Sequence, residues 1–278
     1  MHYLFLTSIA IILWASLAAL VAELAHLPPF FLLACCLLIG GSLSLFHFRK
    51  WQFNTKILLT GVGGIFGYHF FLFMALRLAP PVTANLLNYL WPLFILLFTP
   101  LFLPGTKITA RHIAGTLIAF FGAGLILLQS SLSLSVDHTL GYVLAIVAAV
   151  IWAVYSLLTK RMASFGTATV GLFCLVSGLL SITAHLFLEQ PPTVVFKDWL
   201  KIILLGLGPM GLAFYCWNSA LKKGDPRVIA SLSYFIPLLS TALLIIFNDQ
   251  PFTLITFYSM LFIVSGAILA SIPKKVVI

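Results

Sequence analysis

Long apolar runs with few or no charges limit what this chain can fold into. Residues 3–22 form the first run, and a helix of about 20 apolar residues is long enough to cross the hydrocarbon core of a bilayer. Pro-rich or polar segments separate this run from nine others of similar length. The runs lie at residues 3–22, 28–48, 57–77, 82–103, 109–129, 139–159, 167–188, 199–221, 227–247 and 253–272. The sequence therefore predicts ten transmembrane helices and leaves no space for a soluble domain.

Composition agrees with a polytopic membrane protein and argues against a nucleic-acid partner. Hydrophobic residues make up 62% of the 278 positions and charged residues 8%, whereas a soluble domain carries about 25% charged residues. The net charge of +9 comes from basic residues scattered in ones to threes, so they cannot build a basic face. Four cysteines lie in apolar runs without CxxC spacing, so packing is favoured over metal or redox chemistry, and no cofactor or metal site is expected. These are Cys35, Cys36, Cys174 and Cys216.

The distribution of basic residues predicts the orientation of the chain. If ten helices alternate in direction, twelve of the 15 Lys and Arg residues fall on one side, leaving Arg77, Lys197 and Lys201 on the other. Loops rich in Lys and Arg stay on the cytoplasmic side of a membrane. Both termini are therefore predicted to be cytoplasmic, and an odd number of spans would remove the asymmetry. The first run lacks a preceding basic residue and a small-residue cleavage site, so it is interpreted as a span and not as a signal peptide.

The two halves of the chain resemble each other. At an offset of 145 positions, ALRLAPPVTANLLNYLWPL (75–93) aligns without a gap with ALKKGDPRVIASLSYFIPL (220–238). The matched pairs include Tyr89 with Tyr234 and Pro92 with Pro237. Because each half has five spans, the second copy is expected to be inserted upside down. The predicted fold is thus an all-α protein of two inverted five-helix repeats, residues 1–134 and 135–278, around a central cavity near the membrane midplane.

Polar and aromatic side chains in the middle of these spans mark candidate binding residues. Lipid cannot satisfy polar groups, so they are expected to face the bundle interior. In the fourth span, Asn85, Asn88, Tyr89 and Pro92 share one helical stripe, with Trp91 at its edge. Interfacial Trp and Tyr residues lie near the ends of spans, whereas these lie in the middle.

Wide, hydrogen-bonding side chains at one depth on three helices are interpreted as the lining of a cavity. They are Tyr68, His69, Tyr89, Trp91 and Trp152. Further substrate-binding candidates are Trp14, Asn85, Asn88, Tyr155 and Tyr234. For the small polar residues, hydrogen bonding between helices is favoured over ligand binding. These are Ser156, Thr159, Ser231 and Ser233.

Two matched prolines are candidate hinges. Pro92 and Pro237 each lack a backbone N–H, and a proline inside a helix frees the carbonyl four residues earlier, here that of Asn88 or Ser233. Such kinks let a helix rock, and the matched position in both halves favours this hypothesis. A static packing kink is the alternative.

The placement of acidic residues bears on how transport would be driven. All six carboxylates lie in loops or at span ends, and His69 is the only ionisable residue placed in the middle of a span. A proton-coupled exporter of cations usually needs a buried acid. Export or exchange driven by the substrate gradient is therefore predicted, with His69 as a neutral wall residue. A proton relay through His69 is the alternative.

These motifs resemble a known family along the whole chain. The five-plus-five pattern and A-L-x(4)-P followed by a mid-span Pro resemble the EamA branch of the drug/metabolite transporter superfamily. Tyr68-His69, residues 75–86 and Tyr89-Leu90-Trp91-Pro92 resemble the YddG-type aromatic amino-acid exporters. That resemblance implies export of Phe, Tyr, Trp and other amino acids through a central cavity, whose lining maps onto the five residues named above. Leu72 departs from it, because another aromatic residue is expected there.

The resemblance and the residues together predict an exporter of aromatic and other neutral amino acids in the inner membrane, working by alternating access. Uncharged donors and acceptors suit a zwitterion, and the absence of a mid-span Lys or Arg disfavours phosphorylated substrates. The substrate and membrane lipid are the expected partners, and the protein is expected to be able to function as a monomer. Export of another metabolite or a drug is the main alternative. A channel is disfavoured, and so is an intramembrane enzyme, because the spans contain no catalytic constellation.

Overall fold

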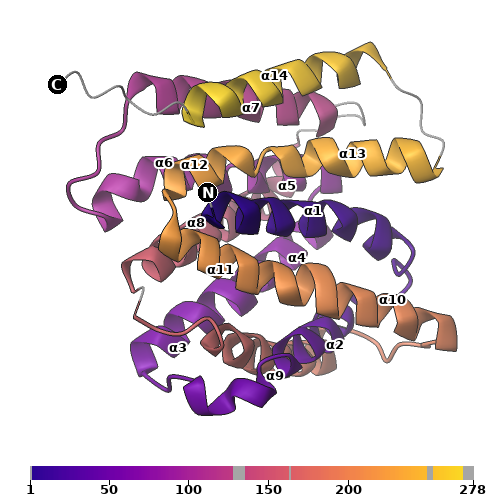
Figure 1. Ribbon diagram of the computed structural model, residues 1–278. Helices are drawn as coiled ribbons and strands as arrows, with labels where there is room; N and C mark the ends of the chain where they lie inside the picture. Colours follow the sequence, from indigo (N-terminus) through magenta and orange to yellow (C-terminus); the bar gives the residue numbers. More distant parts are fainter. Residues whose placement is uncertain (1, 128–134, 163, 249–252, 272–278) are drawn as a thin grey trace.

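The protein is helical throughout the part of the chain that can be described. The computed structural model describes residues 2–127, 135–162, 164–248 and 253–271, and these contain helices and turns but no strand (Figure 1). The predicted repeat boundary at residue 134, most of the NDQP turn at 248–251 with Asp249, and the basic pair Lys274 and Lys275 lie outside the described residues.

Each half of the chain contributes a similar series of elements. The first half contains α1 (His2–Ala22), α2 (Pro29–Ser42), the 3₁₀ helix η1 (Leu45–Lys50), α3 (Thr55–Val62), the π turn η2 (Gly63–Gly67), α4 (Tyr68–Leu78), α5 (Pro81–Asn88), α6 (Trp91–Phe102) and α7 (Ala110–Leu127). The second half contains η3 (Val136–His138), α8 (Thr139–Arg161), α9 (Thr169–Leu188), α10 (Phe196–Leu207), the π turn η4 (Gly208–Leu212), α11 (Ala213–Lys223), α12 (Pro226–Leu232), α13 (Phe235–Asn248) and α14 (Leu254–Ser271).

Seven helices in the described residues are long and apolar enough to cross a membrane. They are His2–Ala22, Thr55–Leu78, Thr83–Phe102, Val136–Arg161, Thr169–Leu188, Phe196–Lys223 and Pro226–Leu243. Three shorter apolar helices are Pro29–Ser42, Ala110–Leu125 and Leu254–Ala270. The helical class predicted from the sequence is therefore confirmed, while the number of ten spans stays a prediction.

The second predicted span is too long at its C-terminal end. Residues 28–48 were expected to form one helix, but α2 ends at Ser42 and the 3₁₀ helix η1 follows. Gly40, Gly41 and Ser42 are weak helix formers, and the side chain of Phe46 in η1 is 92% exposed. Because the whole segment is apolar, its composition does not show that α2 ends at Ser42 and that a separate 3₁₀ helix follows.

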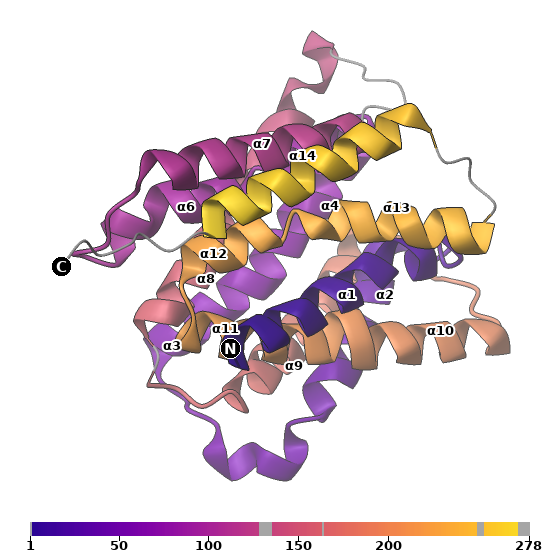
Figure 2. The same ribbon diagram turned by 45° about the horizontal axis from the view of Figure 1, so that its top comes forward.

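Helices from the two halves pack against each other in the middle of the molecule. Near one face α7 lies along α14, and near the opposite face α2 lies along α9 (Figures 1 and 2). Between these pairs, α4 packs against α8 and α1 against α11. Each of these pairs joins one helix from the first half to one from the second. The central helices therefore bring residues far apart in the sequence to one place.

Glycines allow the closest of these approaches. A Cβ on Gly115 of α7 would come within 2.5 Å of the backbone nitrogen of Ala270, and one on Gly266 of α14 within 2.5 Å of that of Ala119. Small residues at such positions let helices in a membrane pack with their backbones in contact. The α7–α14 pair is thus closed to larger side chains at both positions.

Several backbone features recur at the 145-residue offset found in the sequence. The π turn Gly63–Gly67 corresponds to the π turn Gly208–Leu212, and α4 (Tyr68–Leu78) corresponds residue for residue to α11 (Ala213–Lys223). A π turn holds one extra residue and is uncommon. Its presence at the same place in both halves extends the sequence repeat to the backbone.

The fourth and ninth predicted spans are interrupted and not simply kinked. In the first half α5 ends at Asn88 and α6 begins at Trp91, so Pro92 stands in the first turn of a new helix. In the second half α12 ends at Leu232 and α13 begins at Phe235. The N–H groups in the first turn of a helix have no acceptor within the helix, so a proline there removes no hydrogen bond. The expected kink around Pro92 is therefore replaced by a two-residue break before it.

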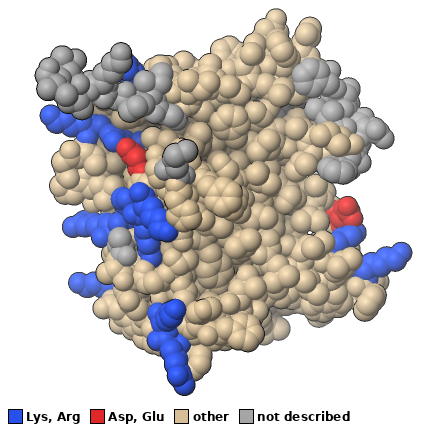
Figure 3. Space-filling view, in the orientation of Figure 1, with Lys and Arg blue, Asp and Glu red and all other residues tan. Residues whose placement is uncertain are grey.

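The surface has the character expected in lipid. Apolar side chains such as Leu101 (72%), Leu186 (72%) and Phe187 (83%) are largely exposed. On the face shown in Figure 3, Lys and Arg side chains lie along the two edges, mostly the left one, and the middle is uncharged. Exposed apolar surface between charged edges is what a chain crossing a bilayer presents.

Candidate functional site

Four tryptophans from four helices meet at the centre of the molecule. Trp14 of α1 contacts Trp217 of α11 with ring centroids 5.2 Å apart, and Trp152 of α8 at 5.7 Å. Trp91 of α6 lies 5.6 Å from Trp217 and 6.4 Å from Trp152. We call these four residues the tryptophan cluster. It joins two helices of the first half to two of the second.

Helices α4 and α11 add further rings to this cluster. Tyr68 lies 5.0 Å from Trp152 and 4.8 Å from His69, measured between ring centroids. Phe214 lies 5.9 Å from Trp152 and 6.1 Å from His69. Tyr155, one turn along α8, lies 5.3 Å from Trp152. Of the five residues predicted to line the cavity, Tyr68, His69, Trp91 and Trp152 are therefore brought together.

These rings pack directly against one another. Centroid separations of about 5 to 6.5 Å are direct ring contacts, which leave no room for another ring between the partners. His69 is 7% exposed, Trp91 5% and Trp152 4%. Trp14 and Tyr68, at the margin of these rings, are only partly buried. The rings thus pack against one another at the point where the sequence predicts a cavity, and the cavity itself stays a prediction.

The two π turns orient two of the ring N–H groups. Nδ1 of His69 lies 2.7 Å from the carbonyl oxygen of Ile65 in η2, and Nε1 of Trp14 donates to the carbonyl of Pro209 in η4 over 3.1 Å. A carbonyl can only accept, so Nδ1 of His69 carries a proton. In the neutral ring Nε2 is then an acceptor. The carbonyl of Ile65 also accepts from the main-chain N–H of Tyr68, so it serves two donors.

The amide of Asn88 is tied to the ring cluster. Its Nδ2 donates to the hydroxyl of Tyr68 over 3.1 Å, while its Oδ1 has no hydrogen-bond partner. Asn88 is 5% exposed. A buried amide oxygen without a donor is uncommon in folded proteins and is available to accept from a bound group. This predicted candidate is therefore adjacent to Tyr68.

Three predicted candidates lie near the helix break and not among the tryptophans. Tyr234 is fully buried, packs against Phe120 at 6.1 Å, and donates from its hydroxyl to the carbonyl of Tyr89 over 3.4 Å. The N–H of Tyr89 in turn bonds to the carbonyl of Asn85. Asn85 is half-buried. These residues thus join α5, α13 and α7 next to the site.

Sequence reasoning did not include Trp217 and Phe214 among the binding candidates. At the 145-residue offset, Trp217 corresponds to Leu72 and Phe214 to His69. The aromatic residue that seemed to be missing at Leu72 is therefore present at the equivalent position of the other half. Applying the repeat to every candidate would have found both residues.

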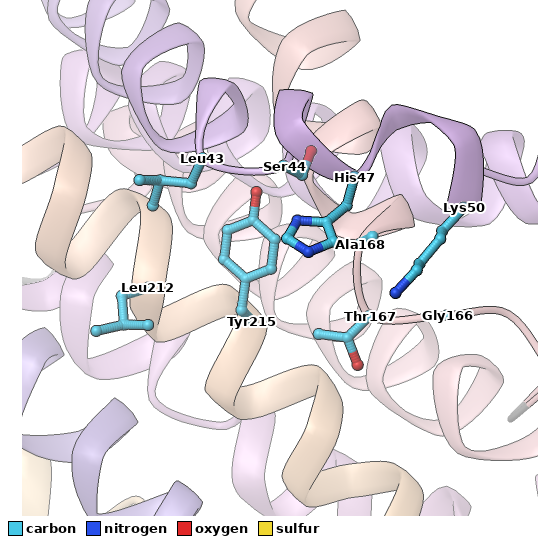
Figure 4. A pocket seen from close by; sticks show the side chains of 9 residues that line it. All are labelled: Leu43, Ser44, His47, Lys50, Gly166, Thr167, Ala168, Leu212 and Tyr215. Carbon is cyan, nitrogen blue, oxygen red and sulfur yellow. The ribbon is translucent and has the colours of Figure 1, made fainter.

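A separate pocket lies away from this centre (Figure 4). It has a volume of about 580 Å³ and is lined by Leu43, Ser44, His47, Lys50, Gly166, Thr167, Ala168, Leu212 and Tyr215. The hydroxyl of Ser44 already donates to the carbonyl of Gly41, and that of Tyr215 to the carbonyl of Gly40. None of the predicted site residues lines this pocket.

Charged side chains join helix ends on the side where α8 ends with Lys160 and Arg161 and α11 ends with Lys222 and Lys223, which we call the Lys-rich face. Nζ of Lys160, near the end of α8, donates to the carbonyls of Lys222 (2.9 Å) and Gly224 (2.8 Å) at the end of α11. Burial opposes the charged form of Asp225, but hydrogen bonds from Arg227 outweigh it and hold the pKa of this carboxyl below its usual range. These contacts hold the end of α8 to the end of α11 at this face.

The opposite face is joined by carboxylates. Glu189, which follows α9, accepts from the N–H groups of Phe30 (2.9 Å) and Phe31 (3.2 Å) in the first turn of α2. His26 lies 3.0 Å from Asp198. Among the described residues no three His, Cys, Asp or Glu side chains are grouped as metal ligands.

Comparison with known proteins places the chain among transporters. The model of the EamA-like transporter family matches residues 1–128 and 139–272. A protein of Ancylobacter novellus named aromatic amino acid exporter YddG is 39% identical over 246 residues, which cover 85% of each chain. An Escherichia coli K12 protein of the same name is 28% identical over 283 residues, 96% of each chain. A solved crystal structure with 36% sequence identity superposes with a TM-score of 0.93 over 97% of this chain and 95% of its own.

Proposed function

Because this chain belongs to the EamA-like transporter family, we propose that it exports aromatic and other neutral amino acids across the cytoplasmic membrane by alternating access. It is a multi-pass membrane protein, and the relatives it resembles are transporters and not enzymes. Two relatives that match 85% and 96% of the chain are named aromatic amino acid exporters. The substrate and the mechanism are the parts proposed here.

One observation carries the choice of substrate: the centre combines aromatic surfaces with uncharged hydrogen-bonding atoms. Nε2 of His69 and Oδ1 of Asn88 can accept from an ammonium, and the hydroxyl of Tyr68 can donate to a carboxylate. Trp91 and Trp152 supply flat apolar surface for a side chain. A zwitterion with an aromatic or large neutral side chain matches both sets of groups.

The proposed architecture is ten spans in two inverted repeats, residues 1–134 and 135–278, with both termini in the cytoplasm. The matched π turns Gly63–Gly67 and Gly208–Leu212 support the repeat, and so does the match of the family model to two separate segments. The excess of basic residues on one side supports the orientation. In such folds the substrate lies where the halves meet, which is where the tryptophan cluster lies.

Each predicted residue is assigned a role in this mechanism. His69, Asn88 and Tyr68 hold the charged head of the amino acid, while Trp14, Trp91, Trp152 and Tyr155 form its walls. Asn85, Tyr89 and Tyr234 lie beside the break between α5 and α6. The breaks before Pro92 and Pro237 are assigned as the hinges, whose movement lets the rings separate.

We propose that the substrate gradient alone drives export. The described carboxylates lie at helix ends or in loops, at Glu23, Asp137, Glu189, Asp198 and Asp225. His69 is held to a main-chain carbonyl and has no acidic partner in the described structure. A second candidate function is export of a related metabolite, because an Escherichia coli relative that is 23% identical is named a probable amino-acid metabolite efflux pump.

Transport by liposomes containing the purified protein tests the proposal. Saturable counterflow of labelled phenylalanine and threonine is expected for the wild type, without a proton gradient, and none for a cationic drug. His69→Leu is expected to lower the rates for both amino acids, and Trp91→Ala to lower that for phenylalanine more. Trp199→Ala, which changes a 42% exposed tryptophan of α10, serves as the control. Normal rates in both site variants would exclude the proposed site, and a wild type that transports neither amino acid would exclude the substrate class.

A further inference from the structure

Three buried polar side chains next to the tryptophan cluster lack hydrogen-bond partners. Tyr155 is 2% exposed, while Thr159 and Asn218 are fully buried. The two hydroxyl oxygens and both amide atoms of Asn218 make no hydrogen bond of normal geometry within the described structure. The hydroxyl of Tyr155 interacts with Thr159 and Asn218, but more loosely than a normal hydrogen bond. We call these three residues the polar triad.

The triad lies between the tryptophan cluster and the Lys-rich face. Tyr155 and Thr159 are four residues apart, so they share one face of α8, and Thr159 is the nearer to Lys160. Asn218 follows Trp217 on α11 toward Lys222 and Lys223, which end that helix. A molecule that moves between this face and the tryptophan cluster would therefore pass the triad.

Leaving four polar atoms without partners in a protein interior is costly. A buried amide or hydroxyl loses its hydrogen bonds to water and must regain them from the protein, from bound water or from a ligand. Helix packing alone does not explain the triad. The neighbouring Ser156 of α8 accepts a hydrogen bond from Nε1 of Trp217 over 3.2 Å. A polar residue that only joins two helices makes such a bond, and the triad residues do not.

The repeat shows that the triad is one-sided. The equivalent of Asn218 in the first half, at an offset of 145, is Phe73. At the offset of 138 that pairs Trp14 with Trp152, Tyr155 corresponds to Leu17 and Thr159 to Val21. Phe73 also contacts His69 and Phe30, with centroids 5.9 and 5.6 Å away. The route toward the Lys-rich face is thus polar, and the equivalent route toward the other face is aromatic and aliphatic.

We infer that the polar triad is a second subsite, which holds the ammonium and carboxylate of an amino acid on its way from the Lys-rich face to the tryptophan cluster. The Asn218 amide donates to the carboxylate, while its oxygen and the hydroxyl of Thr159 accept from the ammonium. The hydroxyl of Tyr155 can serve either group. This inference rests on the proposed function, since it assigns a place to the same substrate.

Apolar replacements of similar shape test the subsite in membrane vesicles. Asn218→Leu, Tyr155→Phe and Thr159→Val each remove the unpartnered atoms and keep most of the volume. Thr99→Val is the matched control, because Thr99 is equally buried but its hydroxyl donates to the carbonyl of Ile95 within its own helix (2.6 Å). Uptake of labelled phenylalanine is measured in inverted vesicles, which present the Lys-rich face outward on the proposed orientation, and in right-side-out vesicles.

If the triad is a subsite, replacing its residues should change KM more at the Lys-rich face than at the opposite face. The triad variants are expected to raise KM roughly ten-fold for phenylalanine presented at the Lys-rich face, with a smaller change at the other face. The rise in melting temperature caused by phenylalanine should shrink in the variants, while the melting temperature without ligand should not fall. Thr99→Val should change neither KM.

Two results would overturn the inference, and they can be told apart. Wild-type KM at both faces and an unchanged phenylalanine-induced rise in melting temperature in all three variants would mean that the triad holds only buried water. Equal loss at both faces would indicate a structural role. A wild type that transports no amino acid would instead remove the proposed function, and this inference with it.

Discussion

The hydroxyl of Tyr234 donates to the main-chain carbonyl of Tyr89 over 3.4 Å, and the two residues stand 145 positions apart, at matching places in the two halves of the sequence. Tyr89 lies in the break between α5 and α6, and Tyr234 lies in the break between α12 and α13. One hydrogen bond therefore joins the two interruptions. A movement at one break must either stretch this hydrogen bond or move the other break with it. The bond therefore couples the two proposed hinges.

Replacing Tyr234 with phenylalanine removes its hydroxyl, which bonds to the carbonyl of Tyr89 and also interacts with the main chain of Leu93. The ring stays in its buried place, so the expected loss is about 1 kcal/mol of unfolding free energy, the contribution of a typical hydrogen bond. Because the breaks then move independently, the transport rate should change while KM does not. Thermal unfolding in detergent and counterflow in liposomes measure the two effects. Tyr258→Phe, at a 54% exposed position, is the control, and equal behaviour of both variants would contradict the coupling.

Two glycines of the first π turn should respond differently to alanine. A Cβ on Gly64 would fall 2.3 Å from the ring of Tyr155, whereas one on Gly67 would lie 3.8 Å from Ile151, an ordinary contact. Overpacking of this kind typically costs about 1–3 kcal/mol. Gly64→Ala should therefore lower the melting temperature and displace Tyr155, while Gly67→Ala should melt like the wild type. Similar melting temperatures for the two variants would show that η2 adjusts freely.

Trp217→Leu tests the contribution of the aromatic residue that the first half lacks. The variant makes position 217 match Leu72, its equivalent. Because Trp217 contacts both Trp14 and Trp91, its loss opens the aromatic walls. KM for phenylalanine should rise several-fold more than KM for threonine in the liposome assay. An equal rise for both substrates would mean that Trp217 only stabilises the fold, and Trp199→Leu controls for loss of an exposed tryptophan.

Lys160→Met should loosen the Lys-rich face. The substitution removes two hydrogen bonds from a charged donor to the carbonyls of Lys222 and Gly224, each worth about 1.5–3 kcal/mol. A reporter cysteine at Thr159, in a background without the native cysteines, should then react roughly ten-fold faster with a membrane-impermeant maleimide added from that face. Lys56→Met, at an exposed position, should leave the rate unchanged. An unchanged rate in Lys160→Met would show that other contacts close this face.

The sequence predicted the features that follow from the inability of lipid to hydrogen-bond with polar groups. Uncharged runs, polar residues on one stripe and wide rings at one depth led to a helical membrane protein in which Tyr68, His69, Trp91 and Trp152 meet. Each of these predictions uses a rule that acts on single residues: a polar group in a span must turn inward. Distance along the chain does not affect such a rule, so residues of α4 and α8 could be assigned to the same depth.

What the sequence did not reveal depends on backbone geometry and on packing. Gly64 of η2 packs against the ring of Tyr155, a fit between distant residues that no local pattern encodes. Pro92 indicated a kink, but proline alone does not show whether the helix bends or breaks there. The direct ring contacts were not predicted, because residue types show that rings can meet and not whether they are in contact. The unpartnered state of Asn218 likewise appears only when its neighbours are known.

The acceptors that hold His69 and Trp14 are main-chain carbonyls, those of Ile65 and Pro209. A mutation at position 65 changes a side chain and leaves the carbonyl in place, so the direction of the His69 N–H is inherited with the backbone. The rings packed around His69 are held by side-chain contacts and can be exchanged one at a time. Evolution can therefore alter the aromatic surfaces at the centre while the orientation of the His69 ring persists.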